Sequence, residues 1–188
     1  LLIPMTKLPE RIALSHAFGG LAAALVGVSE YHRHGPALGA VKLSAVGFEV
    51  MLGALTFTGS LMAFGKLQGM LTEAPVTYRF QNISNVSLLL LSLGLLGGLV
   101  VEPARQALFY SALGLAFLAG ILVVLPIGGA DMPVVISLLN SYAGLAASAT
   151  GFVLSNNVLI IAGALDGAPG FLLSIIMSRA MNRSFTNI

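Results

Sequence analysis

The sequence predicts an all-α fold, a polytopic bundle of six transmembrane helices. Of its 188 residues, 57% are hydrophobic and only 9% are charged, whereas a soluble domain carries about 25% charged residues. Six apolar runs are each long enough to cross about 30 Å of hydrocarbon, which requires about 20 helical residues. Helices are expected because a backbone in lipid must satisfy its hydrogen bonds within its own segment.

Turn-forming and charged residues separate the six predicted spans, which cover residues 10–31, 44–65, 83–101, 106–126, 132–151 and 156–178. An even number of spans puts both termini on one side of the membrane. That side holds six basic residues, namely Lys7, Arg11, Lys66, Arg79, Arg179 and Arg183. The other side holds three, namely Arg33, Lys42 and Arg105. The excess of basic residues predicts that both termini are cytoplasmic.

Composition excludes several kinds of site and partner. The chain has no cysteine and only three scattered histidines, so neither a disulfide nor a metal centre is expected. A net charge of +2 is too small and too dispersed to indicate nucleic acid, which leaves the lipid bilayer as the general partner. Because the sequence begins at Leu1 rather than at methionine, we expect it to be a piece of a longer chain.

Two helix starts in the sequence resemble each other. Pro133 is followed seven residues later by Asn140, and Pro9 is followed seven residues later by His16, each with similar small residues after it. This spacing puts His16 and Asn140 about 10 Å along their helices. Repeats that set polar groups on two helices can build a transport site, although glycine, alanine and leucine are common enough in membrane helices to match by chance.

Five polar residues inside the predicted spans are candidates for a proton path, because polar groups at such depth are costly and indicate a function. They are His16, Glu49, Asn140, Ser141 and Asp166. Structural alternatives exist for most of them: a packed interfacial histidine, a glutamate that snorkels outward, and an amide and hydroxyl that bond between helices. Asp166 needs a partner or a water-filled cavity, and the nearby Pro169 predicts a kink.

Other residues are assigned from their position alone. Asp131, in the loop before the fifth span, is expected to cap that helix or to be solvated. His32 and His34 fall in a polar outer loop, where we expect them to be solvated. Three glycines share one face of the last span and predict close helix packing, namely Gly163, Gly167 and Gly170.

Several motifs together resemble a known family. They are Gly128-Gly129-Ala130-Asp131-Met132-Pro133-Val134-Val135, Leu139-Asn140-Ser141-Tyr142, Gly163-Ala164-Leu165, Thr56-Phe57-Thr58-Gly59-Ser60, Ala63-Phe64-Gly65-Lys66 and the run from Arg179 to Phe185. This set resembles the membrane segment of the beta subunit of proton-translocating NAD(P)+ transhydrogenase, over nearly the whole chain. The resemblance implies that a hydride passes between NADH and NADP+ in two soluble nucleotide domains while a proton crosses the membrane domain.

The resemblance also implies a domain organisation. Residues 1–188 would form the transmembrane proton-translocating domain, the last six of nine helices, and an NADP(H)-binding domain would follow residue 188. The fragment has no glycine-rich nucleotide loop, so no hydride-transfer site, NAD(H) or NADP(H) is expected within it. The implied partners are the alpha subunit with its membrane helices, the NADP(H) domain of the same chain and a second holoenzyme copy in a dimer, in a bacterial inner membrane.

Carried over by position, the resemblance implies a role for several residues. His16 matches the membrane histidine proposed as the proton carrier, Asn140 the channel asparagine, and Glu49 an acidic residue at the outer mouth. Asp131 matches a loop residue implicated in coupling to the NADP(H) domain, and Arg183 lies in the tail that leads to that domain. The sixth span departs from the family, because Ala168-Pro169 replaces two serines and Asp166 stands at a usually apolar position.

The alternative from another functional class is a proton-coupled secondary transporter or a non-catalytic membrane scaffold. Six helices with a weak repeat also fit a small carrier. A carrier for an organic solute, however, needs several polar groups at mid-membrane, whereas those found here suit protons. A nucleotide-binding domain encoded beyond Ile188 would favour the transhydrogenase.

Overall fold

The computed structural model describes residue 4 and residues 7–182. Within that part of the chain there are six α-helices and no strand, and all six helices are long and apolar enough to cross a membrane. This confirms the predicted six-helix transmembrane fold. The helices are α1 (Leu8–His34), α2 (Ala40–Leu67), α3 (Gln81–Val101), α4 (Gln106–Val124), α5 (Met132–Val153) and α6 (Asn157–Ala180), with 3-10 turns at Gly35–Ala37 and Gly129–Asp131.

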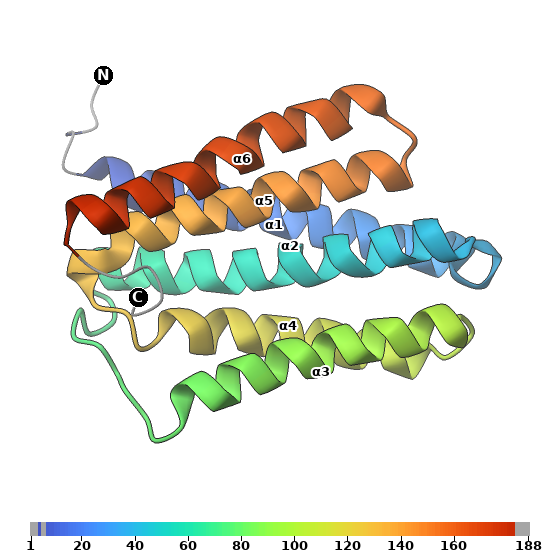
Figure 1. Cartoon of the computed structure of the whole chain (residues 1–188), viewed down its shortest axis with the longest axis horizontal. Helices are drawn as coiled ribbons and strands as arrows, with labels where there is room; N and C mark the ends of the chain where they lie inside the picture. Colours follow the sequence, from blue (N-terminus) through green and yellow to red (C-terminus); the bar gives the residue numbers. More distant parts are fainter. Residues whose placement is uncertain (1–3, 5–6, 183–188) are drawn as a thin grey trace.

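Helix α2 lies at the centre of the bundle (Figure 1), in contact with α1, α3, α4 and α5. In its most apolar stretch 61% of the residues are buried, against 17% in α3 and 22% in α6. Helix α6 packs on the far side of α5, and α3 packs on α4. Helix α2 therefore joins two helix pairs, α3–α4 and α5–α6, while α1 packs against α2 and α5.

The connections alternate between the two ends of the bundle (Figure 1). One end, here called the long-loop end, holds residues 68–80 and 125–131 together with the start of α1 and the end of α6. The other, the short-turn end, holds residues 35–39, 102–105 and 154–156.

The helices extend somewhat beyond the apolar runs that predict them. Helix α2 begins at Ala40 rather than at 44, and α1 continues through three polar residues to His34 rather than ending at 31. Hydropathy marks the stretch that suits lipid, whereas helical hydrogen bonds continue into polar residues. Local chemistry sets some ends: the Asn156 side chain accepts a hydrogen bond from the Leu159 amide at 3.2 Å and caps the start of α6.

Small residues allow the closest helix contacts. A Cβ atom added to Gly53 of α2 would lie 2.7 Å from the carbonyl oxygen of Gly20 in α1. On α6, a Cβ on Gly163 would collide with the backbone of Ser148 in α5, and Gly167 packs against the Ser141 carbonyl of α5. Such contacts bring α5 and α6 close enough for their short polar side chains to meet.

Candidate functional site

A cleft of about 730 Å³ lies between α1, α5 and α6. Its polar lining consists of His16 from α1, Ser137 and Asn140 from α5, and Asp166 from α6. The remaining lining is apolar and includes three prolines, namely Pro9, Pro133 and Pro169. The cleft therefore brings together three of the five sequence candidates, each from a different helix.

Asn140 and Asp166 form a hydrogen-bonded pair of side chains in the cleft. The Asn140 Nδ2 atom donates to the Asp166 Oδ1 atom at 3.4 Å and to the Asp166 carbonyl oxygen at 3.5 Å. The Asp166 carboxylate is also near enough to interact electrostatically with the His16 ring. A carboxylate near an imidazole can offset the charge that the ring carries when it is protonated.

Glycine 170 provides the space that the Asn140 amide occupies. A Cβ atom at this position would lie 3.0 Å from Asn140 Nδ2 and 3.0 Å from the Ser137 carbonyl oxygen. The Ser137 hydroxyl in turn donates to the Gly170 carbonyl oxygen at 2.8 Å. These contacts fix the amide against α6.

Ser141 does not line this cleft. It is 3% exposed and lies at the contact between α5 and α6, where its backbone faces Gly167 and Gly170. The serine that reaches the cleft is Ser137, one helical turn earlier. The sequence singled out Ser141 because it adjoins Asn140, but adjacent helix positions point about 100° apart.

Glu49 lies away from the cleft, in the half of α2 nearer the short-turn end. The residue has no exposed surface, so the snorkelling alternative is wrong. Neither of its carboxylate oxygens has a hydrogen-bond partner among the described residues. Thr150 of α5 lies beside the carboxylate, but its hydroxyl donates to the Ala146 carbonyl oxygen at 3.0 Å.

Glu49 packs over Gly27 of α1, where an added Cβ would lie 3.3 Å from the Glu49 Cδ atom. Gly27 is eleven residues along α1 from His16, a distance of about 16 Å along the helix axis. The structure thus separates Glu49 from the cleft by about three helical turns.

Two buried hydroxyls lie on α2 between the levels of Glu49 and His16. Thr56 and Ser60 follow Glu49 by seven and eleven residues, which puts all three on one face of the helix. Both residues have no exposed surface, and neither hydroxyl has a hydrogen-bond partner within the described part of the chain. Buried polar atoms of this kind are commonly hydrogen-bonded to ordered water.

The sequence reasoning missed Thr56 and Ser60 as site residues, although it quoted them as part of a family motif. The detectable signal was their spacing from Glu49 within an apolar span, at two and three helical turns. Neither residue stands out alone, because threonine and serine usually bond back to their own helix in membranes.

Asp131 lies at the long-loop end, immediately before α5. The sequence left two structural alternatives for Asp131, a helix cap or a solvated loop residue. The residue is 7% exposed, so it is not solvated, and its side chain makes no capping hydrogen bond to α5. Arg183, the other residue expected to act in coupling, lies outside the described residues.

A buried lysine holds the loop that carries Asp131. Lys66, at the end of α2, is 1% exposed and donates from Nζ to the carbonyl oxygens of Leu125 at 2.6 Å and Ile127 at 2.8 Å. The Gly129 amide donates to the Glu73 carbonyl oxygen at 2.9 Å, which joins this loop to the other long connection. The two long loops therefore form one hydrogen-bonded surface around Asp131.

Among the residues that the structure describes, no three histidine, aspartate or glutamate side chains come together as a metal site would require. The polar groups of the cleft are spread over three helices and mixed with apolar side chains.

Comparison with known proteins identifies the family. The family model described as "NAD(P) transhydrogenase beta subunit" matches residues 1–188. Two curated relatives named "NAD(P) transhydrogenase subunit beta", one from Rhodospirillum rubrum and one from a designated strain of that species, are each 44% identical over 191 residues. The alignments cover 98% of this chain but 41% of each relative, so the chain spans about two fifths of their length. The chain belongs to the NAD(P) transhydrogenase beta subunit family.

Proposed function

We propose that this chain provides the proton path of an NAD(P) transhydrogenase, in which proton translocation is coupled to hydride transfer between NADH and NADP+. The observation that carries the proposal is the convergence of His16, Asn140 and Asp166, from three helices, on one cleft. Family membership supports the transhydrogenase context.

His16 is the proton carrier in this proposal. Histidine changes charge near neutral pH and can both accept and release a proton there. The Asn140 amide orients the Asp166 carboxylate. This carboxylate attracts the positive charge of a protonated His16 ring. Ser141 contributes by fixing the α5–α6 contact behind Asn140.

The path continues from His16 toward Glu49 through water held by the Thr56 and Ser60 hydroxyls. The support is that these hydroxyls and the Glu49 carboxylate are buried on one helix face and lack partners among the described residues. Water bound between them would bridge a distance that side chains alone do not span.

Coupling is proposed to act at the long-loop end. An NADP(H)-binding domain following residue 188 would contact the surface around Asp131, with Arg183 in the segment that leads to it. The state of that domain would determine which side of the membrane His16 can reach. A difference of a few kcal/mol between two states is enough for such a switch.

The exposed side of α6 supports the expectation of further helices in the assembly. Asp166 is exposed on the surface of this six-helix bundle, and a charge facing lipid costs several kcal/mol. Membrane helices of an alpha subunit, or other helices of the same chain, are proposed to cover it in a dimeric holoenzyme of a bacterial inner membrane. NAD(H) and NADP(H) would bind the soluble domains and not residues 1–188.

The test is proton pumping by the full-length holoenzyme carrying His16→Ala in vesicles, with hydride transfer assayed in parallel. Collapse of both pumping and the coupled reaction, in an enzyme that still assembles, supports the proposal. Pumping at the wild-type ratio would show that His16 is structural and that the path lies elsewhere.

A further inference from the structure

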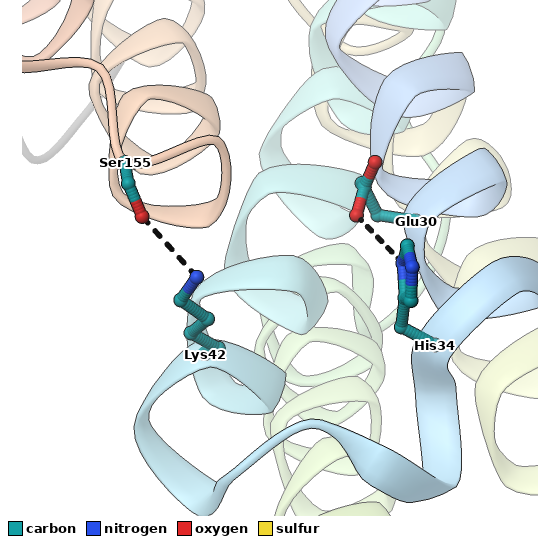
Figure 2. A network of polar contacts seen from close by, with 4 residues as sticks. All are labelled: Glu30, His34, Lys42 and Ser155. Carbon is teal, nitrogen blue, oxygen red and sulfur yellow. Dashed lines mark hydrogen bonds and ion pairs between the residues drawn. The ribbon is translucent and has the colours of Figure 1, made fainter.

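A group of polar side chains lies at the short-turn end of the bundle, between Glu49 and the aqueous phase. Figure 2 shows two pairs there: Glu30 with His34, both on α1, and Lys42 of α2 with Ser155, between α5 and α6. His34 Nδ1 lies 3.2 Å from Glu30 Oε2, and Lys42 Nζ donates to Ser155 Oγ at 3.2 Å. None of the four residues belongs to the proton path described above.

Glu30 and His34 lie in register with Glu49. Gly27, which packs over the Glu49 carboxyl group, precedes Glu30 by three residues and His34 by seven, so the three positions share one face of α1. Glu30 is thus about 4.5 Å, and His34 about 10 Å, further along the axis than the position that touches Glu49. The Glu30 carboxylate is close enough to Glu49 for their charges to interact.

The three titratable groups become steadily more buried along this face. The side chain of His34 is 57% exposed, that of Glu30 is 20% exposed, and Glu49 has no exposed surface. The Glu49 carboxylate lies at the buried end of the series, beside the Thr150 hydroxyl of α5. The three groups therefore lead from solvent to the buried Glu49 carboxylate, and along α1 successive positions are no more than about one helical turn apart.

Several other polar groups at this end have partners of their own, and Arg33, next to His34 on α1, is exposed. Lys42 bonds to Ser155, Glu102 pairs with Arg105 at 3.1 Å, and His32 Nδ1 lies 3.5 Å from the Tyr110 hydroxyl. The group of α5 that faces Glu49 is the Thr150 hydroxyl, which donates a hydrogen bond to the Ala146 carbonyl oxygen. Glu30 and His34 are therefore the charged pair aligned with Glu49.

We propose that Glu30 and His34 form a proton-collecting relay, which exchanges protons between the aqueous phase and Glu49. The imidazolium of His34 gives its proton to the Glu30 carboxylate, and the resulting carboxylic acid passes that proton to the Glu49 carboxylate. Glu49 passes the proton on toward His16, and His34 takes another proton from solvent, so each group returns to its starting state. The relay rests on the proposed function, because it needs Glu49 to lead to His16.

The experiment uses the full-length holoenzyme in proteoliposomes, at alkaline pH and low buffer capacity, where delivery of protons limits the rate. Glu30→Gln and His34→Gln are each expected to slow pumping and coupled hydride transfer several-fold. A high concentration of imidazole should restore both rates, because a small mobile buffer can deliver protons at the short-turn end in place of the missing side chain. Glu30→Asp keeps the carboxylate and should retain most of the rate, which guards against a variant that is merely misfolded.

Two matched variants control for the loss of a surface charge at the same end. His32→Gln removes a neighbouring histidine and Glu102→Gln a neighbouring carboxylate, and both should pump like the wild type. Wild-type rates in Glu30→Gln and His34→Gln at low buffer would overturn the relay, as would a loss that imidazole fails to restore. If His16→Ala still pumps normally, the proposed function fails; if only the relay variants are normal, the relay alone fails.

Discussion

The Asn140 amide of α5 donates to the Asp166 carboxylate of α6 at 3.4 Å, at the wall of the cleft that also holds His16. The two residues are 26 positions apart in sequence, and the close α5–α6 contact brings them together. A charged side chain in a membrane helix is thus held beside the one histidine that lines the cleft.

Replacing Asp166 with asparagine tests what its charge does. The variant keeps the size and an oxygen that can accept from Asn140, but it loses the attraction for a protonated His16. We expect loss of this attraction to slow proton transfer about tenfold, which corresponds to about 1.4 kcal/mol in the activation barrier. Proton pumping in vesicles should fall by about this factor, most at alkaline pH, and unchanged pumping at all pH values would exclude Asp166 from the path.

Glycine 170 is predicted to be essential for the position of Asn140. In Gly170→Ala the added Cβ would be 3.0 Å from Asn140 Nδ2 and from two backbone atoms of α5, so α5 or the amide must shift. We expect lower pumping and a loss of stability of about 1–3 kcal/mol, measured by thermal unfolding of the purified holoenzyme. Gly94→Ala on α3, where an added Cβ meets nothing within 4 Å, is the control and should behave as wild type.

Removing the Thr56 or Ser60 hydroxyl should impair proton transfer without destabilising the protein. Thr56→Val and Ser60→Ala remove hydroxyls that have no protein partner in the described residues, so no internal hydrogen bond is lost. The matched variant is Thr58→Val, because the Thr58 hydroxyl donates to the Phe117 carbonyl oxygen of α4 at 2.8 Å. It should lower thermal stability while pumping continues. The opposite pattern would contradict a hydrated path along this face of α2.

Lys66 is predicted to support coupling through the loop it holds. Lys66→Met would leave two carbonyl oxygens without their donor, at a cost of about 1–3 kcal/mol in stability, and would free the loop that carries Asp131. Hydride transfer should then proceed with fewer protons moved per hydride, as measured in vesicles. The exposed Lys42→Met serves as control, and equal proton-to-hydride ratios in both variants would show that Lys66 is not involved in coupling.

The sequence was sufficient to predict the fold because lipid imposes length and apolarity on every span. It also related His16 to Asn140, since equal spacing from a proline gives equal depth. It could not show which side each residue faces, because spans such as α6 are apolar all round and have no polar face to define a direction. The sequence therefore could not predict that Ser137, rather than Ser141, reaches the cleft. Nor could it predict that Glu49 lies about three turns away from the cleft.

Lys66 illustrates another limit of sequence reasoning. Counted as a loop charge for topology, it is in fact buried, because the end of α4 offers it two carbonyl oxygens. Partners that lie 59 and 61 residues away leave no mark in the local pattern of residues. The same holds for Asn140 and Asp166, whose meeting depends on glycines that the sequence reasoning linked only to packing.

The central claim, that His16 carries the proton, is tested most directly by observing its protonation state. Infrared difference spectra of the full-length holoenzyme with isotope-labelled histidine, recorded between its NADP+-bound and NADPH-bound states, would report this change, with His16→Gln used to assign the band. The proton-path account predicts an imidazole band that changes between the two states and disappears in His16→Gln. A His16 imidazole in the same protonation state under both conditions, across the pH range in which the enzyme pumps, would contradict it.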